Sequence, residues 1–451
     1  MPIVESEARR ILGRALELGK PRADEVEAWI GGGTHALTRF AENTIHQNVL
    51  ERTAELTVRA AIGKRTARAE TNKLDEAGIR ACIGNAVGLA KVAPEDPELL
   101  PVLAGAQAYA KVEALDPATA ASTPDARADA VKAVVDACAA AGATAAGAFE
   151  VVDGSIGGYG EIGTVGLLTS KGTFAYHTGT YASFTVTVTA GEGSGWAHGE
   201  SWRAKDLDPA ALGKRALEKA LASREAQDLE PGKYTVVLEP AAMAEFVAWY
   251  LGGAFSAQAV EEGRSPISGK LGQKIAGENV TIRSDVAALR GRPFDEEGTP
   301  TQKVVLVEKG VQQGLFHDRK TAQRAGVKPT GHAPRQPSGW GPQPRAIVLE
   351  GGTGTADDLV KTVERGVLVT RFWYTNTVDE RQGIVTGMTR DGTFLIENGA
   401  VKHAVKNMRF NEALLPLLGR IERLGAAERI YGALVPPAVV REFNFSSGTK
   451  F

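Results

Sequence analysis

The sequence predicts an α+β protein, with an N-terminal α/β domain over residues 1–228 and a β-rich, barrel-like C-terminal domain over residues 229–451. Two observations support this prediction. In the first half, stretches with apolar residues at helical spacing enclose stretches in which apolar and polar residues alternate, as they do in half-buried strands. In the second half, short apolar strands separated by turns dominate, and helical patterns are few.

Length and composition are those of an ordinary globular chain of two or three domains, with 451 residues, 43% hydrophobic and 24% charged. The net charge of −2 lacks the basic footprint of a general nucleic-acid or membrane-surface binder. No apolar run approaches the roughly 18 residues of a membrane span, and Glu5 and Glu7 stand where a signal peptide needs positive charge. The two cysteines, Cys82 and Cys138, exclude a disulfide framework and a multi-cysteine metal module. We therefore expect a cytoplasmic protein without nucleic-acid or membrane partners.

An internal repeat is indicated in the first half, and residues 1–92 form its first unit. Apolar spacing predicts a helix around residues 8–16, and alternation predicts a strand around residues 26–30. The GGGT segment is expected to turn the chain into a second strand that ends at Phe40. A third strand around residues 53–60 and a helix over about 74–90 complete the unit.

A Pro-rich linker, residues 93–123, separates this unit from the second one, residues 124–224. The same order of elements returns there: a helix over about 125–141, strands around Phe149, 165–168, Phe174 and 184–190, and a helix over about 209–222. Leu56 and Val186 are 130 residues apart (186 − 56), and Val58 and Val188 share this offset. The two units are expected to share one sheet.

The motif LEPGKY, residues 229–234, marks the boundary to the C-terminal domain. A strand over 235–238 precedes a helix that begins at Pro240 and ends near Gly252 and Gly253. Hairpins are expected at residues 308–310 and at Asn398-Gly399, and a last helix over about 412–424. Further strands are predicted around 280–282, 302–307, 346–349, 367–372 and 384–388. The breaker-rich segment 328–344 is expected to be a functional or partner-facing loop.

The glycines of RAIVLEGGTGTADDLV could form a phosphate cradle, because backbone N–H groups at a helix start attract anions. The segment lacks both the Gly-Lys-Ser/Thr of a P-loop and the third glycine of a dinucleotide fingerprint. Thr355 and Asp358 form a capping box, which explains the sequence without a ligand. The capping box is the favoured interpretation.

The histidines offer no helical zinc pair, because none is followed by another at i+3 or i+4. His198 and Glu200 either alternate onto one face of a strand or lie in a solvated loop, and the loop is favoured. His317 and His332 flank an Arg-rich stretch that begins near Arg319. They either line a cleft or lie on surface loops, which is the favoured interpretation.

Two charged or aromatic stretches are candidates for peptide binding. The run Arg319, Lys320, Arg324 and Lys328 is either a solvated helix face or a site for a carboxylate or phosphate. RFWYTNTVD places aromatic residues on both faces of a strand, which suits either recognition of an extended peptide or burial between layers. The candidate substrate-binding residues are therefore His317, Arg319, His332, Arg371, Tyr374 and Asn376.

Three segments resemble a known family: RFAENTIHQN, KGVQQGLFHDRKTAQRAGVKPTGHAPR, and VTGMTRDGTFLIENGAVKHAVKNMRFNEALL after the Gly-rich turn. Over essentially its whole length the chain resembles the TldD/PmbA (TldE) family, often labelled "modulator of DNA gyrase". The resemblance implies a two-subunit metalloprotease. In its TldD-type subunit, two histidines of a helical His-Glu-x-x-x-His motif and a distant cysteine hold zinc, and the glutamate is the general base. The TldE/PmbA-type subunit shares the fold and lacks these residues.

The metal helix of this family follows a strand and precedes a Ser-Gly-x-x-Gly motif, which is SGKLG at residues 268–272 here. Aligned without a gap, the first histidine falls on Ala248, the glutamate on Trp249 and the second histidine on Gly253. A shift does not restore the motif, because residues 199–316 contain no histidine. The loop of the cysteine reads MTRDG. The resemblance therefore implies that this chain has no catalytic or metal-binding residue and binds no cofactor.

The expected function is that of a non-catalytic subunit that helps to form the cleft for unfolded or extended peptides. Zinc is then expected in a TldD-type partner subunit, and the chain alone could form a homodimer. Trp249 and Tyr250 are expected to pack rather than to line the cleft. Two alternatives stay open: a stand-alone peptide- or protein-binding regulator of the gyrase-modulator type, and a peptidase with a relocated metal site that uses His198, His317 or His332.

Overall fold

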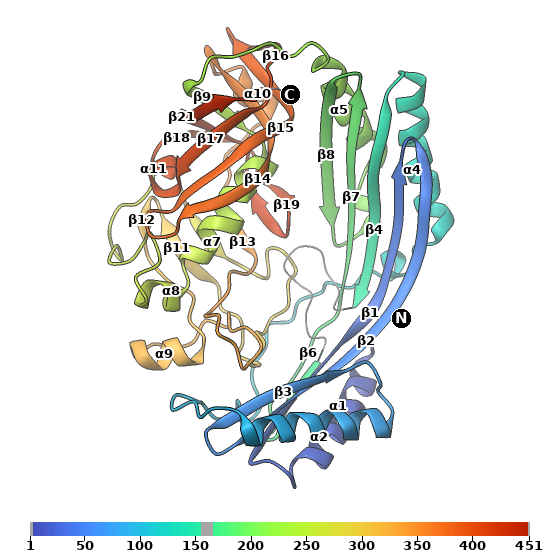
Figure 1. Ribbon diagram of the computed structural model, residues 1–451, viewed down its shortest axis with the longest axis vertical. Helices are drawn as coiled ribbons and strands as arrows, with labels where there is room; N and C mark the ends of the chain where they lie inside the picture. The colour runs from blue at the N-terminus through green and yellow to red at the C-terminus, as the bar shows by residue number, and fades with distance from the viewer. Residues whose placement is uncertain (1–2, 155–165, 450–451) are drawn as a thin grey trace.

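The computed structural model describes residues 3–154 and 166–449. A long, curved sheet runs along one side of the molecule, and the C-terminal half lies beside it (Figure 1). The N-terminal half contains α1 (Glu5–Gly19), β1 (Glu25–Ala41), β2 (Thr44–Ile62), β3 (Arg65–Thr71), α2 (Glu76–Val92), α3 (Pro117–Ala120), α4 (Pro124–Ala140), β4 (Thr144–Gly154), β5 (Gly166–Thr169), β6 (Phe174–Tyr176), β7 (Gly179–Ala190), β8 (Gly193–Ser201), η1 (Ala204–Asp206) and α5 (Pro209–Ala222). Val165, part of one predicted strand, lies outside the described residues.

The N-terminal sheet is antiparallel, with the order β3-β2-β1-β4-β7-β8, and β5 also pairs with β1. Helices α1 and α2 lie at one end of the sheet, and α4 and α5 lie at the other (Figure 1). The helix–strand–helix order therefore occurs twice on one sheet. Each helix pair has its own apolar core, formed with β1–β3 at one end and with β4, β7 and β8 at the other.

The predicted turn at the GGGT segment is wrong, because β1 runs without interruption from Glu25 to Ala41. The glycines allow close passage of strands instead of a reversal. A Cβ atom on Gly33 would lie 1.8 Å from the Asp153 carbonyl oxygen of β4. Gly32 has a φ of 152°, which a residue with a side chain rarely adopts. These positions let β1 continue from its pairing with β5 to its pairing with β4.

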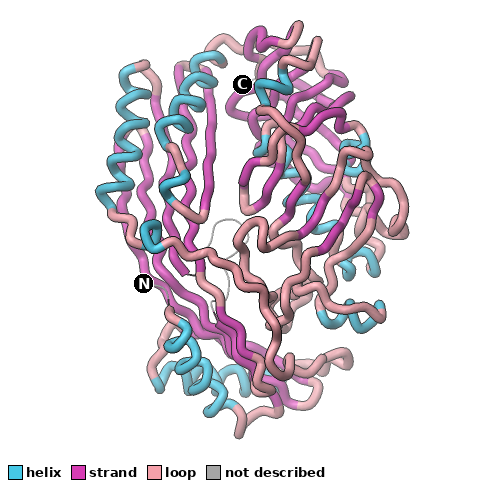
Figure 2. The backbone as a smooth tube through the Cα atoms, turned by 180° about the vertical axis from the view of Figure 1, so that it is seen from behind, coloured by secondary structure: helices cyan, strands magenta, loops and turns pink. Residues whose placement is uncertain are grey.

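The C-terminal half consists mostly of strands and loops with short helices (Figure 2). Its elements are β9 (Gly232–Leu238), α6 (Pro240–Ala244), η2 (Glu245–Leu251), α7 (Gly252–Ala254), α8 (Ala257–Glu261), β10 (Ile282–Ser284), β11 (Val304–Glu308), β12 (Val311–Gln312), α9 (Arg319–Ala325), β13 (Ile347–Leu349), α10 (Ala356–Val360), β14 (Arg365–Asp379), β15 (Ile384–Glu397), β16 (Ala400–Ala404), β17 (Met408–Ala413), α11 (Leu414–Gly419), β18 (Ile421–Leu424), β19 (Glu428–Ile430), β20 (Ala433–Val435) and β21 (Ala438–Gly448).

Five of these strands close into a barrel in the order β14-β9-β21-β17-β15, because β15 pairs back onto β14. A second sheet has the order β12-β11-β10-β13-β20-β19. The core between them is rich in fully buried aromatic rings, such as Phe246, Phe372, Phe410 and Phe443, whose centroids lie 4.5–6.2 Å apart. The predicted α+β class with a barrel-like C-terminal half is confirmed. Among the described residues, no helix is long and apolar enough to cross a membrane.

Two predicted helices differ from the structure. The last helix ends at Gly419, and residues 421–424 form β18 instead of its continuation. The helix predicted from Pro240 to Gly253 is not a regular α-helix, because residues Glu245–Leu251 form a π-helix between two short α-helical turns. In a π-helix each N–H bonds to the carbonyl five residues earlier, so residues five apart lie near one another on one face.

The glycine pattern of β1 yields a test of how tightly the sheet is packed. Replacement Gly33→Ala is expected to destabilise the protein by about 3 kcal/mol, because the new Cβ would overlap the Asp153 carbonyl oxygen. Gly13→Ala is the matched control, since no atom lies within 4 Å of its Cβ position on α1. It is expected to stabilise the helix by about 0.5–1 kcal/mol. Urea unfolding curves measure both, and equal effects of the two variants would contradict the close passage.

Candidate functional site

The positions that match the family metal motif lie on and just after the π-helix. Ala248 and Trp249 belong to η2, and Gly253 follows in α7. Ala248 and Gly253 are five residues apart (253 − 248), which is the spacing that a π-helix brings to one face. In a regular α-helix, five residues correspond to about 140° around the axis. The π-helical turn therefore brings Ala248 and Gly253 closer to one face than a regular α-helix would.

The residues at these positions do not fit zinc. Ala248 and Gly253 have no ligand atom, and the Trp249 indole N–H donates but does not coordinate. In the part of the chain that the structure describes, no group of three or more His, Cys, Asp or Glu side chains is placed to hold a metal ion. His198, His317 and His332 belong to no such group among these described residues.

Trp249 and Tyr250 differ in their surroundings. Tyr250 is half-buried, and its hydroxyl donates a hydrogen bond to the Thr375 carbonyl of β14 at 2.6 Å. This agrees with the packing role expected for it. The Trp249 side chain is 48% exposed and faces Tyr431, with 6.0 Å between the ring centroids. Packing alone therefore does not describe Trp249, which presents half of its surface to solvent.

A chain of stacked aromatic rings and guanidinium groups, here called the aromatic ladder, crosses from the N-terminal sheet to the barrel. His198 of β8 lies 5.5 Å from Tyr431 and 5.9 Å from Trp196, whose ring lies beneath the Arg371 guanidinium at 5.1 Å. Trp373 continues the ladder, with Arg371 at 5.4 Å and Arg390 at 4.5 Å from its centroid. Together with Trp249 next to Tyr431, the ladder has an exposed tryptophan near each end. The ladder joins β8, η2, β14 and β15 through one run of stacked aromatic and cationic side chains.

Arg371, one of the candidate substrate-binding residues, is paired with a carboxylate of the chain itself. Its Nε donates to Asp391 Oδ2 at 2.7 Å, and Nη2 contacts the same oxygen. Asp391 is 3% exposed and belongs to the MTRDG segment, where the family places its cysteine. The pair neutralises both charges, so that Arg371 holds the ladder in place.

Tyr374 and Asn376, the other candidates on β14, lie on the surface. Tyr374 is 75% exposed and has a φ of 53°, which is rare for an aromatic residue. The Asn376 side chain donates to the Tyr374 carbonyl at 2.8 Å and fixes this conformation. The register of β14 against β15 shifts between Trp373 and Asn376. The alternative of burial between two layers therefore fails for Tyr374, although Phe372 is fully buried.

His198 and Glu200 lie on one face of a strand, so the favoured loop interpretation is wrong. His198 Nε2 lies 3.3 Å from Glu200 Oε2, and both side chains are buried. Glu200 also faces Arg429 at 3.2 Å and accepts from the Gly432 backbone N–H at 2.9 Å. Burial works to raise the pKa of Glu200, but the His198 hydrogen bond and the Arg429 charge outweigh it and leave that pKa below its usual value. Glu200 thus ties β8 to the β19–β20 turn.

The remaining candidates, His317, Arg319 and His332, have structural partners. His332 is fully buried against Phe316, 4.3 Å between centroids, and its Nε2 lies 2.9 Å from Ser284 Oγ. Burial, reinforced by Arg345, lowers the pKa of His332 to about 3, so its imidazole is neutral. Arg319 faces Glu297 at 3.9 Å. The half-buried His317 donates its backbone N–H to Thr330 Oγ1 at 2.8 Å, and its carbonyl accepts from the Thr330 backbone N–H at 2.9 Å.

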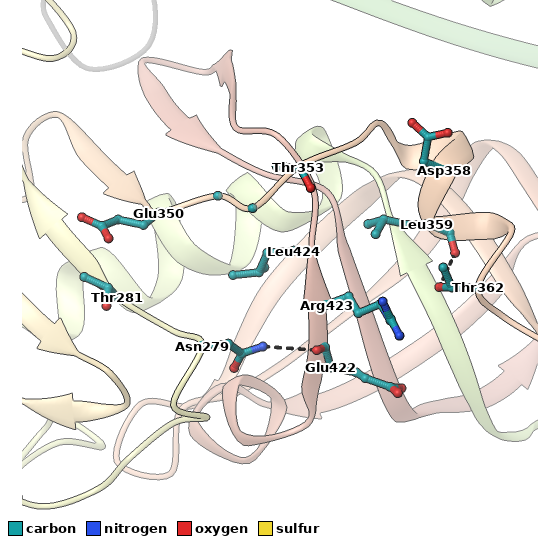
Figure 3. A pocket seen from close by; sticks show the side chains of 12 residues that line it. Asn279, Thr281, Glu350, Thr353, Asp358, Leu359, Thr362, Glu422, Arg423 and Leu424 are labelled. Carbon is teal, nitrogen blue, oxygen red and sulfur yellow. Dashed lines mark hydrogen bonds between the residues drawn. The ribbon is translucent and has the colours of Figure 1, made fainter.

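The Gly-rich segment 350–353 borders a cavity of about 460 Å³ (Figure 3). Glu350, Asp358 and Glu422 line it, together with Arg423. The three carboxylates would repel a bound anion. Helix α10, with five residues, is also too short to offer a helix N-terminus that attracts one. The predicted capping box is present, since Thr355 and Asp358 bond to each other's backbone N–H. The structure thus favours the capping box over a phosphate cradle.

The buried Glu200 carboxylate yields a pH-dependent prediction. Glu200→Gln is expected to lower the free energy of unfolding by about 2–3 kcal/mol at pH 7, because Arg429 loses its charge partner. The folded pKa of Glu200 is depressed, so this contribution is complete above the unfolded pKa near 4.5 and is lost as pH falls further. The difference between wild type and variant should therefore shrink at pH 4. Tryptophan fluorescence during urea unfolding measures it.

The control for this experiment is Glu218→Gln. Glu218 forms an exposed pair with Lys214 at 3.8 Å on α5, and its loss is expected to change the unfolding free energy by less than about 0.5 kcal/mol. A Glu200→Gln variant as stable as the control would contradict a role for Glu200 in joining the two halves.

Sequence comparisons identify relatives in both halves. Residues 231–447 match the PmbA/TldA metallopeptidase C-terminal domain, and residues 112–224 match the PmbA/TldA metallopeptidase central domain. A metalloprotease of Methanothermobacter thermautotrophicus is 29% identical over 279 residues, which cover 58% of this chain and 60% of the relative. A metalloprotease TldD homolog of Buchnera aphidicola is 28% identical over 217 residues, covering 47% of this chain and 44% of the relative. The chain thus spans at most about 60% of the length of these relatives in the alignments.

Solved structures share the fold along the whole chain. TldE from Thermococcus kodakarensis superposes with a TM-score of 0.86 at 19% identity, covering 96% of this chain and 99% of that structure. A candidate modulator of a DNA gyrase from Thermotoga maritima superposes with a TM-score of 0.81 at 21% identity, covering 97% and 99%. The two matching domains and the shared architecture show that the chain belongs to the metalloprotease-related TldD/PmbA family.

Proposed function

We propose that this chain is the non-catalytic subunit of a TldD/TldE-type heteromeric zinc metalloprotease and helps to form the cleft for unfolded or extended peptides. One observation carries the proposal: Ala248 and Trp249 on the π-helix and Gly253 on the turn after it stand where the resemblance aligns the first histidine, the glutamate and the second histidine. The chain would act in the cytoplasm beside a TldD-type subunit that holds the zinc. In the absence of this partner, it would form a homodimer.

The surface around β14 supports a role in peptide binding. Trp373, Tyr374 and Val378 are 45%, 75% and 61% exposed, which places apolar area on one strand end. Exposed apolar and aromatic side chains on rigid strands are suited to binding partners. The positive φ of Tyr374 holds its ring outward at some cost in backbone energy, which is common where a side chain serves binding.

Strand addition to β14 is restricted at one point. Beyond Val369, the edge of β14 that pairs with β9 is no longer engaged by that strand. However, the Thr375 carbonyl already accepts a hydrogen bond from the Tyr250 hydroxyl, and the Thr375 hydroxyl donates to Glu245 at 2.5 Å. A peptide at this edge would therefore be held by side chains such as Tyr374 rather than by a continuous backbone ladder.

Zinc content and proteolysis test the proposal directly. The purified chain is expected to retain far less than one equivalent of zinc after dialysis and to leave an unfolded peptide intact. Addition of a TldD-type subunit should give cleavage, because that subunit supplies ligands and general base. A TldD-type subunit with its general-base glutamate replaced by glutamine is the control. Cleavage by the chain alone would overturn the proposal, and peptide binding without cleavage in the mixture with the active TldD-type subunit would favour the stand-alone regulator.

The exposed tyrosine provides a second test in the reconstituted protease. Tyr374→Ala is expected to raise KM for a peptide about tenfold and to leave kcat within about twofold, because only ground-state contacts are removed. Leu271→Ala is the control, since Leu271 is also exposed, at 62%, but follows α8 instead of β14. An unchanged KM for Tyr374→Ala would exclude this strand end from the cleft.

A further inference from the structure

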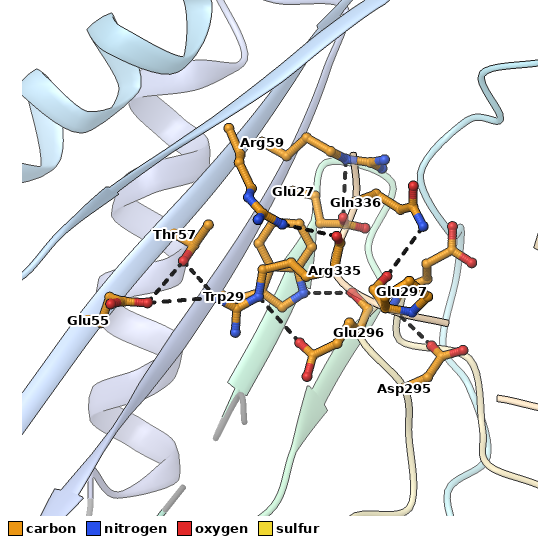
Figure 4. A network of polar contacts seen from close by, with 12 residues as sticks. Glu27, Trp29, Glu55, Thr57, Arg59, Asp295, Glu296, Glu297, Arg335 and Gln336 are labelled. Atoms are coloured by element: carbon orange, nitrogen blue, oxygen red, sulfur yellow. Dashed lines mark hydrogen bonds and ion pairs between the residues drawn. The ribbon is translucent and has the colours of Figure 1, made fainter. Parts of the chain in front are cut away.

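The N-terminal sheet and the C-terminal half meet at a second place, here called the seam, where β1 and β2 face loops 292–299 and 328–344 (Figure 4). Trp29 Nε1 donates to the Glu296 carbonyl at 2.7 Å across this seam. Arg335 reaches from the long loop to Thr57 Oγ1 at 2.9 Å. The predicted functional loop 328–344 thus helps to fasten the two halves together.

Four buried carboxyl groups gather inside the seam, and those of Glu27, Asp295 and Glu297 are the most deeply buried. Glu27 of β1 and Asp295 have no exposed area, and Glu297 is 5% exposed. Arg59 of β2 faces Glu27 at 3.2 Å, and Arg319 of α9 faces Glu297 at 3.9 Å. The carboxyl groups therefore come from both halves of the chain, and two guanidinium groups oppose them directly.

Other positive charges nearby are engaged elsewhere. Arg292, Arg335 and Arg345 face the carboxylate of Glu296 at 2.6, 3.4 and 3.6 Å. Asp295 is satisfied by backbone N–H groups of residues 297, 299 and 333, each at 2.9 Å. Among the described residues, by contrast, neither carboxyl oxygen of Glu27 has a hydrogen-bond partner, although Arg59 lies 3.2 Å away as an ion-pair partner.

The charged groups on the elements around this cluster influence the pKa values of its carboxyl groups. Burial raises the pKa of Glu27 to about 7. The positive charges of Arg59 and Arg319 oppose this rise, and the negative charges of Asp295 and Glu296 add to it. Burial and the Asp295 charge raise the pKa of Glu297, with Glu27 adding to the rise and Arg319 and Arg59 opposing it. Burial also raises the pKa of Asp295, which the backbone N–H groups and Arg345 oppose.

We propose that Glu27, Asp295 and Glu297 form a proton-operated latch, which holds the N-terminal sheet against the C-terminal half while protonated and loosens when it ionises. In the loosened state water reaches the carboxyl groups, and their pKa values return to the ordinary range near 4. The closed state therefore binds more protons than the loosened state from about pH 4.5 up to the raised pKa values, which are about 7 for Glu27 and about 8 for Glu297. A rise in pH through this window favours loosening, by at most about tenfold per pH unit for each proton released.

Hydrogen–deuterium exchange of the full chain tests the latch. Peptides covering residues 292–299 and 328–335 are compared with peptides of the barrel strands β9 and β21, which correct for intrinsic exchange rates. Between pH 6.5 and pH 8.5, the opening constant of the seam is expected to rise at least about tenfold relative to the barrel. The double variant Glu27→Gln/Glu297→Gln should remove most of this rise, because its amides stay neutral.

The matched control is Glu55→Gln, which removes an exposed carboxylate 3.7 Å from Arg335 in the same network. Its pH profile should equal that of the wild type. A seam whose exchange is independent of pH in the wild type would overturn the latch, whether or not the double variant folds. A double variant with the same pH dependence as the wild type would overturn it as well, because the titrating groups would then lie elsewhere.

Discussion

The continuity of β1 is the constraint on which the rest of the structure depends. This strand pairs with β2 along its whole length, with β5 near one end and with β4 near the other. It therefore joins the two helix pairs into one sheet, and it also carries Glu27 and Trp29 to the C-terminal half. Gly33 makes this possible, because no side chain could lie where the Asp153 carbonyl oxygen lies. A turn at the glycines would have produced two separate small sheets, and the C-terminal half would not lie beside one continuous sheet.

The sequence predicted features that local chemistry decides and missed those that depend on distant packing. Asn398 and Gly399 adopt the positive φ values that their hairpin requires, and α5 has the predicted bounds. Strand β8 is the less favoured of the two interpretations that the sequence offers for its segment, which contains three glycines. In the structure they admit α5, since a Cβ on Gly195 would lie 2.1 Å from the Ala216 carbonyl oxygen.

The candidate site shows the same division. The expected lack of zinc ligands at residues 248 and 253, and of a general base at residue 249, could be predicted from the chain alone, because it concerns residue types at a known spacing. The role of Arg371 could not, since its partner Asp391 lies on another strand and the pair is defined by the barrel. His332 was selected for its chemistry, but complete burial makes it a neutral packing residue. The signal that would have identified β8 is the alternation of Trp196, His198 and Glu200.

The π-helix has a consequence for the side chains of this segment. Its widened turn is an uncommon backbone state, and it contains Ala248 and ends shortly before Gly253. Side chains introduced at residues 248 and 253 would therefore lie nearer to one face than in a regular α-helix, without any insertion or deletion in the chain.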